Sequence, residues 1–328
     1  MRLPDEIEQI IEEKVKNISL NELREKAKNL SDRYMNDERK GQSLIDNKLD
    51  ALVYSIIRMP STYCTVKSVI EKSLIDKNDI TSFIDFGAGT GAATLAINEL
   101  LNIKYGICIE RESNMQILGE EYIKLTYPNI DIDWLNVDIE KIEINKKADL
   151  VISSYMLNEI KKENRLNLVK RLLKCSNKYL IIIEPGTPEG FFNIKEIQNY
   201  AVDNKIKIIG PCVKDIKCKL PENDWCHSIV RVERNKLHKF LKDGDAPFED
   251  EKFSYIVLSK IENCEEHDNK DINDNKSINY RILRHPIIEK GKITVKICSG
   301  DKIEDKVITK KQKEIYKNIR KKKCGDLI

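Results

Sequence analysis

A short glycine-rich segment is the first place in the chain where residue types and spacing could do chemistry. Gly87, Gly89 and Gly91 follow the apolar run 83–86 and precede an amphipathic stretch. Glycine lets a chain turn tightly and approach a ligand closely, and the helix that follows offers free N–H groups to that ligand. The spacing G-x-G-x-x-A also fits the loose pattern of dinucleotide-binding loops, so the glycines alone do not choose the cofactor.

Acidic residues around this loop narrow the choice. Asp85 precedes the first glycine by two residues, where a carboxylate can receive the ammonium of S-adenosylmethionine but would repel the pyrophosphate of a nicotinamide cofactor. Glu110 ends the next apolar run, placed to accept two ribose hydroxyls. Asp138 follows the run after that, where methyltransferases hold the adenine amino group. Each of the last two could alone be a loop or cap residue, but the set in this order predicts S-adenosylmethionine.

Three cysteines form a second group with chemical potential. Cys212, Cys218 and Cys226 stand as C-x5-C-x7-C within fifteen residues of irregular sequence. Thiolates gathered at one point repel each other unless a metal compensates. The spacing lacks the C-x2-C pairs of zinc ribbons, whereas three local cysteines and one distant cysteine suit a cubane iron–sulfur cluster with four thiolate ligands. Zinc remains the alternative metal.

Cys298, at the end of a predicted strand, is our choice for the fourth ligand. Cys264 lies in an acidic segment and Cys324 in a basic one, and we expect neither segment to hold a ligand rigidly. His227 adjoins Cys226, so the two would share one metal only with difficulty. We interpret the remaining well-spaced cysteines as small buried hydrophobes: Cys64, Cys108 and Cys175.

The motifs identify no catalytic base or nucleophile. Pro211 and Cys212 match the Pro-Cys pair of cytosine C5 methyltransferases, yet that nucleophile follows the fourth strand, a place held here by residues 153–156. The N-P-P-Y element of amino methylation is absent from the sequence. The Tyr-x-x-x-Lys pair of short-chain dehydrogenases occurs only at 63–67, ahead of the glycine loop, which excludes that class.

The elements that must position these residues alternate along the middle of the chain. Short apolar runs alternate with amphipathic stretches at a spacing that implies parallel strands covered by helices on both faces. We therefore predict an α/β, Rossmann-like domain. The predicted strands are 82–86, 105–109, 132–135, 150–153 and 180–183, and the predicted helices are 91–101, 113–124, 162–175 and 191–203.

The flanking regions differ from this middle part. Before it, apolar residues recur at helical spacing, and one helix is expected to stop at Met59 and Pro60. After it we expect a charged helix over 231–241, a strand over 253–258 and a hairpin of 280–288 with 292–298. The predicted domains are an N-terminal helical extension 1–75, the Rossmann-like domain 76–208, a Cys-rich metal-binding and β region 209–308 with an acidic insertion 262–277, and a basic tail 309–328.

Charge and composition limit the kinds of partner that the protein can have. The 328 residues include 57 Lys and Arg against 54 Asp and Glu, a net charge of +3, so an RNA contact must be argued from local charge. The longest apolar run, 179–183, is far too short for a membrane span. The acidic first residues are unlike a secretory signal or an organellar presequence. We expect a cytoplasmic protein with reduced cysteines.

The C-terminal segment offers the best local case for phosphate contact, although basic ends also serve solubility. Its candidate RNA-binding residues are Lys310, Lys311, Lys313, Lys317, Arg320, Lys321, Lys322 and Lys323.

Five sequence elements, spread over nearly the whole chain, point to one family. They are R-M-P-S-T-Y at 58–63, D-F-G-A-G-T-G at 85–91, E-P-G-T-P at 184–188, the region 211–234 with W-C-H at 225–227, and D-E-K-F-S-Y at 250–255. Through them the chain resembles the methyltransferase-like proteins of the small ribosomal subunit, which are known from mitochondrial ribosomes and from bacterial relatives.

The resemblance implies a class I methyltransferase fold that binds S-adenosylmethionine, and a 4Fe–4S cluster on Cys212, Cys218, Cys226 and Cys298. It also implies a role on the small ribosomal subunit and its rRNA, through rRNA methylation or subunit assembly. Some members are regarded as assembly factors without activity, so the alternative is a non-catalytic rRNA-binding factor. We expect no membrane partner and a monomer away from the ribosome.

Overall fold

The computed structural model describes residues 1–35, 44–141, 143–261 and 280–328. It falls into two compact units, which we treat separately. Unit 1 comprises Met1–Ile183 with Val230–Glu251, and unit 2 comprises Glu184–Ile229 with Lys252–Ile328. The predicted acidic insertion, with Cys264, lies outside the described residues.

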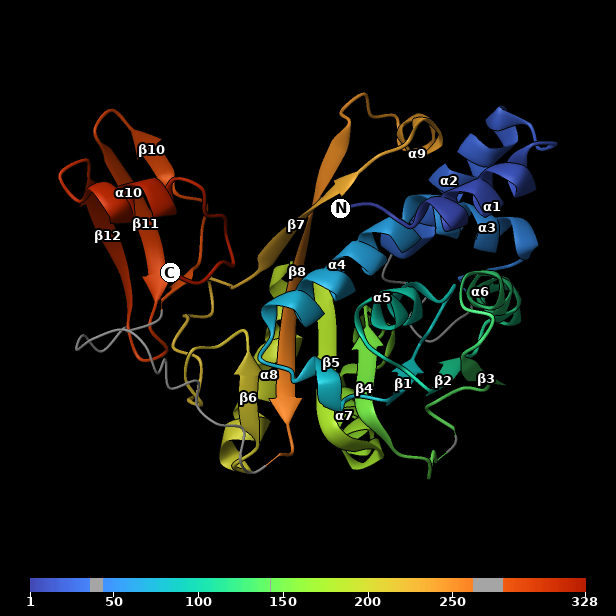
Figure 1. The fold of residues 1–328 in the computed structure, drawn as a ribbon, viewed down its shortest axis with the longest axis horizontal. Coiled ribbons are helices and arrows are strands. Elements are labelled where there is room, and N and C mark those ends of the chain that lie inside the picture. The colour runs from blue at the N-terminus through green and yellow to red at the C-terminus, as the bar shows by residue number, and fades with distance from the viewer. Residues whose placement is uncertain (36–43, 142, 262–279) are drawn as a thin grey trace. The chain divides into compact units, whose positions relative to one another are not determined.

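A parallel sheet forms the centre of unit 1 (Figure 1). β1 lies between β2 and β4, and the carboxyl-end residues Asp85 and Phe86 pair with parallel neighbours on both sides. The order β3-β2-β1-β4-β5 is that of a doubly wound α/β fold, so the predicted Rossmann-like sheet is confirmed. The strands are β1 (Ser82–Phe86), β2 (Tyr105–Glu110), β3 (Asp131–Asn136), β4 (Ala148–Ser154) and β5 (Ser176–Pro185).

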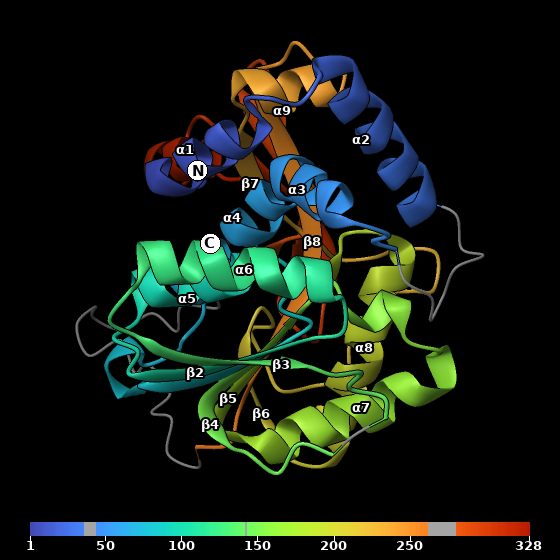
Figure 2. The same cartoon turned by 90° about the vertical axis from the view of Figure 1, so that its right-hand side faces the viewer.

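Helices cover both faces of this sheet. β1 is buried along all but its first residue, which explains its continuous apolar sequence, since a parallel strand with helices on both sides has no solvent face. α5 (Ala92–Leu100) and α6 (Ser113–Thr126) lie on one face and α7 (Lys162–Cys175) on the other (Figure 2). The predicted strands and helices of this region agree with the observed ones to within a few residues.

The N-terminal helices are α1 (Asp5–Val15), α2 (Leu20–Met35), α3 (Lys48–Ile57) and α4 (Met59–Lys72). The helix expected to stop at Met59 and Pro60 does end there, but α4 starts at once, because proline fits the first turn of a helix. Short 3₁₀ turns occur at Lys77–Asp79 and Leu157–Glu159. In the described part of the chain, every helix is too short or too polar to cross a lipid bilayer.

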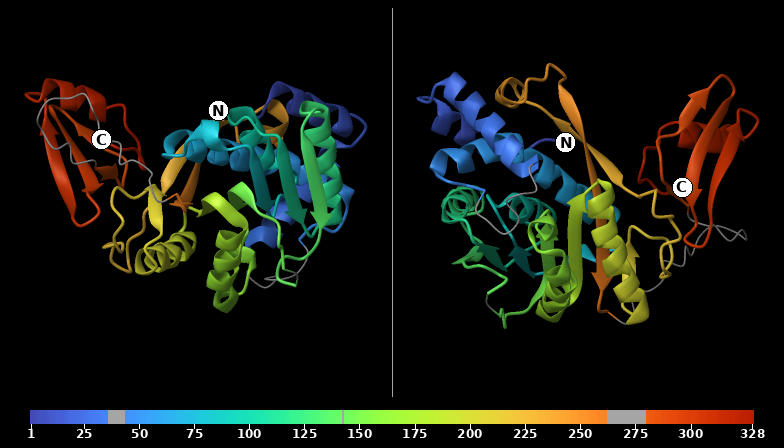
Figure 3. Two further views of the ribbon diagram at one scale, coloured as in Figure 1. Left: turned by 60° about the horizontal axis from the view of Figure 1, so that its bottom comes forward. Right: turned by 180° about the vertical axis from the view of Figure 1, so that it is seen from behind.

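The prediction of a charged helix over 231–241 is wrong for its first residues, which form a strand. Strand β7 (Ser228–Glu233) pairs with β8 (Phe248–Ser259), and only α9 (Lys236–Leu241) is helical. Val230 and Val232 are buried while Arg231 and Glu233 are exposed. This alternation is typical of a strand, but the charged residues around it make the sequence resemble a polar helix. α9 packs beside α2 (Figure 3).

Unit 2 contains α8 (Pro188–Asp203) and β6 (Lys207–Gly210), which pairs antiparallel with β8. Its C-terminal part is an antiparallel sheet ordered β10-β11-β12, with β9 beside β11. α10 (Lys313–Ile319) packs on that sheet through Tyr316 and Ile319 (Figure 1). The predicted hairpin is confirmed, but its first strand is reduced to two short pieces. These strands are β9 (Arg281–Ile282), β10 (Ile287–Glu289), β11 (Lys292–Cys298) and β12 (Ile303–Thr309).

Candidate functional site

The glycine loop joins β1 to α5 in unit 1. Gly87, Gly89 and Gly91 all have left-handed backbone, with φ of 76°, 57° and 80°. The N–H groups of Gly87 and Ala88 both donate to the carbonyl of Ile109 at the end of β2, at 2.9 and 3.0 Å. A Cβ at Gly87 would lie 3.0 Å from Sδ of Met156. The loop is therefore held tightly against neighbouring strand ends, and the position of Gly87 tolerates no side chain.

Two of the predicted cofactor-binding acids lie against this loop. Asp85 is fully buried, and its Oδ2 accepts a hydrogen bond from Oγ1 of Thr94 at 2.9 Å. Burial raises the pKa of Asp85 to about 7. Glu110 accepts from the N–H groups of Gly89 and Glu112, both at 2.8 Å, and burial raises its pKa as well. Each oxygen of Glu110 keeps a lone pair, so the carboxylate can still accept two hydroxyls.

Unpaired polar atoms gather at the same edge. Asp85 Oδ1, Thr90 Oγ1 and Ser153 Oγ are buried, and none of them has a hydrogen-bond partner in the described structure. Ser153 ends its parallel pairing opposite Phe86, the neighbour of Asp85. Buried polar atoms are costly unless they are hydrogen-bonded, so this edge fits a polar ligand. The sequence motifs did not mark Thr90 or Ser153 as ligands, because isolated hydroxyl residues carry no spacing signal.

Asp138 lies two residues beyond β3 and stabilises the turn that follows. Its Oδ1 accepts from the N–H of Glu140 at 3.0 Å, and Lys141 forms an ion pair with it at 3.0 Å. Partial burial opposes ionisation, but these two interactions together lower the pKa of Asp138. The N–H of Val137 donates to the carbonyl of Glu110 at 3.2 Å, which places the Asp138 turn beside the end of β2. Its role toward adenine stays a prediction.

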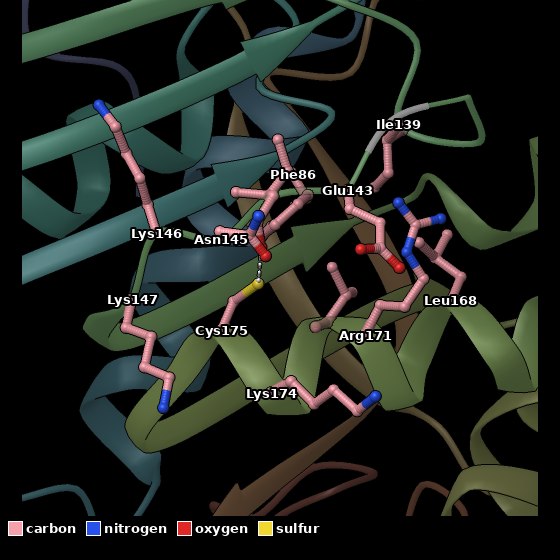
Figure 4. Close-up of a pocket in the computed structure, with 12 residues that line it drawn as sticks. Phe86, Ile139, Glu143, Asn145, Lys146, Lys147, Leu168, Arg171, Lys174 and Cys175 are labelled. Atoms are coloured by element: carbon pink, nitrogen blue, oxygen red, sulfur yellow. Dashed lines mark hydrogen bonds between the residues drawn. The ribbon is translucent and has the colours of Figure 1, made fainter.

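A separate cavity of unit 1 lies between α7 and the connection from β3 to β4 (Figure 4). Phe86, Ile139 and Leu168 contribute apolar surface, and Lys146 and Lys174 add positive charge. None of the predicted cofactor residues lines this cavity, although Phe86 and Ile139 are the chain neighbours of Asp85 and Asp138.

The four predicted metal ligands share one cavity within unit 2. Cys212 follows β6, Cys218 and Cys226 lie in the irregular segment before β7, and Cys298 ends β11, yet all four line the same space. Apolar residues surround this cavity. Leu220 and Leu283 are buried, and Cys218, Cys226 and Cys298 pack against them. The fold thus brings Cys298 close to the three cysteines that are near one another in the sequence.

Each of these four sulfurs accepts a hydrogen bond. Nε2 of Gln198 donates to Cys212 at 3.3 Å, Nε of Arg281 to Cys226 at 3.2 Å and the N–H of Gly300 to Cys298 at 3.2 Å. The backbone of Leu220 supplies the bond to Cys218. Such N–H···S bonds surround the thiolates of metal centres, where they tune and orient the ligands.

Arg281 supplies a buried positive charge to this group. The residue is 4 % exposed, and its guanidinium also donates to Oγ of Ser228 at 2.9 Å. Burial and the neighbouring sulfurs raise the pKa of Cys212 to about 12, so this thiol ionises only where a cation compensates it. No motif marked Arg281 or Gln198, because both reach the cysteines from distant parts of the sequence.

Three family-like elements meet beside Cys226. Nε1 of Trp225 donates to the carbonyl of Gly186 at 3.0 Å, and the N–H of Gly186 donates to the carbonyl of Lys252 at 2.9 Å. Oγ of Ser254 donates to the carbonyl of Cys226 at 2.8 Å. The motifs at 184–188, 225–227 and 250–255 therefore fix the segment that carries Cys226.

Other candidate ligands are placed differently. Cys324 is buried, and its sulfur lies 3.1 and 3.3 Å from the carbonyl oxygens of Leu283 and His227, either of which can accept the one thiol proton. The expectation that its segment is loosely held is wrong, because the chain packs back on the sheet. Nδ1 of His227 is buried without a partner in the described structure.

Among residues 1–35, 44–141, 143–261 and 280–328, no three His, Cys, Asp or Glu side chains form a group that could hold a metal ion.

The basic C-terminal residues surround α10. Its inward face carries Tyr316 and Ile319, which belong to the core of the antiparallel sheet. Lys322 is half-buried and donates to the carbonyl of Leu327 at 3.0 Å. The other seven are exposed: Lys310, Lys311, Lys313, Lys317, Arg320, Lys321 and Lys323. These charges therefore belong to a folded element.

Comparison with known proteins identifies a family. The model of the mitochondrial small ribosomal subunit Rsm22 family matches residues 48–328. No curated protein matches the chain.

Solved methyltransferases show a weaker likeness. A candidate RNA methyltransferase from Pyrococcus horikoshii is 16% identical, with 62% of this chain and 87% of that chain covered and a TM-score of 0.43. Magnesium protoporphyrin IX methyltransferase from Synechocystis, solved with bound SAM, is 13% identical, with 79% and 99% covered and a TM-score of 0.41. Because these TM-scores and identities are low, we assign the fold from the strand order of unit 1 and not from these structures.

Proposed function

The chain belongs to the mitochondrial small ribosomal subunit Rsm22 family, and on this premise we propose that it binds S-adenosylmethionine and acts on the small ribosomal subunit and its rRNA. The observation that carries the cofactor proposal is the edge of β1, where a left-handed glycine loop, the acceptor Glu110 and the unpaired Asp85 Oδ1 lie together. We place the protein in the cytoplasm, where its thiols stay reduced.

The residues have distinct roles in this proposal. Asp85 receives the ammonium of the cofactor, Glu110 its ribose hydroxyls and Asp138 its adenine amino group. The glycine loop admits the cofactor close to the backbone, and the start of α5 offers free N–H groups. When bound, S-adenosylmethionine supplies an electrophilic methyl group. The chain's part is to orient it and to exclude water.

The protonation of Asp85 gives the cofactor proposal a direct test. Its pKa of about 7 means that an increasing fraction is neutral as the pH falls, and a neutral acid does not attract an ammonium ion. The cofactor ammonium itself stays charged below about pH 7.7. We expect affinity for S-adenosylmethionine to fall about 20-fold between pH 7.5 and pH 5.5, in proportion to the ionised fraction of Asp85.

Calorimetry at the two pH values measures this dependence. Asp85→Asn is the matched variant, because it keeps the shape of the side chain and leaves Glu110 in place. It should bind more weakly at pH 7.5 and lose the pH dependence. A wild-type protein that binds no cofactor, or a variant with the same pH profile, would contradict the proposed site.

We propose that Cys212, Cys218, Cys226 and Cys298 hold a 4Fe–4S cluster. In the described part of the chain their side chains do not yet form a group that could hold a metal ion, and the support for the cluster is that all four line one cavity. A cubane presents one iron to each of four thiolates, so its ligands surround a cavity, as these four do. The hydrogen bond to every sulfur and the buried guanidinium of Arg281 suit a centre whose ligands are thiolates. We propose a structural role, because a cluster would join the irregular segment before β7 to the end of β11.

The charged surface around α10 supports contact with rRNA. Because Tyr316, Ile319 and Cys324 are buried, deletion of 309–328 would damage the core of unit 2, and charge neutralisation is the cleaner test. Binding of the variant K310Q/K311Q/K313Q/K317Q to small-subunit particles should depend less on salt, by about 0.7–0.9 in the logarithmic slope for each lysine–phosphate interaction that the substitutions remove.

Four exposed lysines of unit 1 provide the control. The variant K104Q/K124Q/K161Q/K162Q removes the same charge from surfaces with no proposed role in RNA binding. Binding measured across a salt series should then keep the wild-type slope. Equal slopes for both variants would show that the α10 surface has no special part in RNA binding.

A further inference from the structure

A second group of side chains in unit 1 lies beside the glycine loop and has no part in the cofactor or cluster proposals. Tyr155 and Met156 directly follow β4, and Met156 is the residue that a side chain at Gly87 would strike. Arg58 separates α3 from α4. These segments bring an arginine and several tyrosines to the edge of the sheet where the cofactor is proposed to bind.

Arg58 places a cation in this group, and the charges of Tyr54 and Glu251 outweigh the effect of burial and raise its pKa. Its side chain is exposed, and in the described ranges its guanidinium makes neither a hydrogen bond nor an ion pair. It lies over the ring of Tyr34, 5.6 Å from the centroid. The rings of Tyr34 and Tyr54 are 6.0 Å apart at 42°. An exposed guanidinium beside two half-buried aromatic rings is a surface on which a planar base can stack while its phosphate lies near the positive charge.

Tyr155 is held in a strained conformation. Its φ of 60° is left-handed, which is unfavourable for a residue with a side chain. The N–H donates to the carbonyl of Ile183 at 2.8 Å. The hydroxyl oxygen lies 3.2 Å from Oγ1 of Thr65 and 3.4 Å from Oε1 of Glu251, either of which can accept its one proton. Such strain persists only where several interactions enforce it, and it is concentrated at functional sites.

The group lies within electrostatic range of the proposed cofactor residues. After burial, the carboxylates of Glu159 and Glu110 contribute to raising the pKa of Tyr34 and Tyr54. Glu110 is the proposed ribose ligand and bonds directly to the glycine loop. Contacts agree with this proximity, because Met156, the neighbour of Tyr155, lies against Gly87, and Arg111, the neighbour of Glu110, donates to Glu159 at 3.0 Å.

We propose that Arg58, Tyr34 and Tyr155 form a subsite for one unpaired nucleotide of single-stranded RNA, beside the cofactor. This inference rests on the proposed function, because it assigns the acceptor side of the same site. Unpaired bases are recognised by stacking on tyrosine rings and guanidinium planes, and the phosphate adds attraction to arginine. A duplex hides its bases and does not suit this arrangement.

The test uses the full, cluster-loaded chain with S-adenosylhomocysteine present. The probe is a fluorescein-labelled, mixed-sequence single-stranded RNA of about 12 nucleotides, within the span that such binding surfaces cover, and binding is read by anisotropy. Arg58→Gln should weaken binding about tenfold, and Tyr34→Leu similarly, as expected for loss of one stacked base. The same RNA as a duplex should bind wild type and Arg58→Gln alike.

Arg24→Gln is the matched control. Arg24 also lies over an aromatic ring, 5.1 Å from the centroid of Phe240, but it pairs with Asp243. It should bind RNA like wild type. Ultraviolet crosslinking followed by mass spectrometry should locate RNA on Tyr34 or Tyr155. Equal affinities for Arg58→Gln and Arg24→Gln, or crosslinks confined to 310–323, would overturn the subsite.

Cofactor affinity separates this inference from the proposed function. All three variants should keep wild-type affinity for S-adenosylmethionine, because none of the replaced residues is a cofactor ligand. Normal cofactor binding with unchanged RNA binding would overturn the subsite alone. Loss of cofactor binding in the wild type would overturn the proposed function.

Discussion

Replacement of Cys226 by serine should remove about nine-tenths or more of the bound iron and leave a poorly folded unit 2. The sulfur of Cys226 is the acceptor for Nε of Arg281, so its loss leaves that guanidinium buried without its charged partner. Breaking a buried ion pair costs roughly 3–5 kcal/mol, and binding energy at a structural metal site is folding energy. Iron analysis and the free energy of unfolding of anaerobically prepared protein measure both effects.

Cys324→Ser is the matched control in the same unit. Cys324 is buried, but its thiol only donates its one proton to a nearby carbonyl, of Leu283 or His227, a role that a serine hydroxyl can take over. This variant should keep its iron and most of its stability. Full iron content in Cys226→Ser, or equal losses in both variants, would contradict a cluster on the four cavity cysteines. Zinc in place of iron at the same stoichiometry would identify the alternative metal.

Gly87→Val should lower affinity for S-adenosylmethionine by about 100-fold or more, equivalent to roughly 2.7 kcal/mol. The φ of 76° is unfavourable for a β-branched residue. A new Cβ would also lie 3.0 Å from Sδ of Met156. The loop must shift to relieve both, and a shifted loop loses its two bonds to the carbonyl of Ile109. Calorimetry with purified protein measures the loss.

Gly291→Val separates loop geometry from general backbone strain. Gly291 has a similar φ of 88°, but nothing lies within 4 Å of a Cβ built there. Its turn joins β10 to β11 in unit 2, so the variant should lose some stability and keep cofactor affinity. Wild-type affinity in Gly87→Val would show that the cofactor does not use this loop.

The sequence predicted the parallel sheet well because strands covered on both faces are apolar at every position. β7 was missed because Arg231 and Glu233 supply charge at every second residue, and the flanking charges of α9 extend that pattern. A strand with one exposed face inside a charged segment resembles a helix surface in composition. The periodicity of burial distinguishes the two only once the partner strand is known.

The two candidate sites were predictable to different degrees. The glycine loop and Glu110 could be recognised because short-range spacing and strand ends determine their position. The distant Cys298 could only be chosen by elimination, and the structure brings it to the other three. Arg281 and Gln198 could not be recognised as neighbours of the cysteines, because they reach them from remote segments. Interactions of that kind depend on tertiary packing and leave no local pattern.

The basic C-terminus shows how composition can mislead about structure. Eight basic residues among sixteen suggested a tail, but α10 buries Tyr316 and Ile319. The apolar pair lies three residues apart, on one face of the helix, while Lys313 and Lys317 are exposed on the rest of its surface. Surface charge and an ordered fold coexist here.

The most direct test of the central claim is cosedimentation of the cluster-loaded protein with immature small ribosomal subunits, in the presence of S-adenosylmethionine labelled in its methyl group. We predict that the wild-type protein and the label sediment together with the particles. The Gly87→Val protein should still sediment with the particles, but without the label. Extraction of the rRNA then shows whether the label is covalently attached, as an enzyme requires, or only bound, as an assembly factor requires. Protein that does not reach the particles, or that reaches them with no label above the Gly87→Val level, would contradict the account.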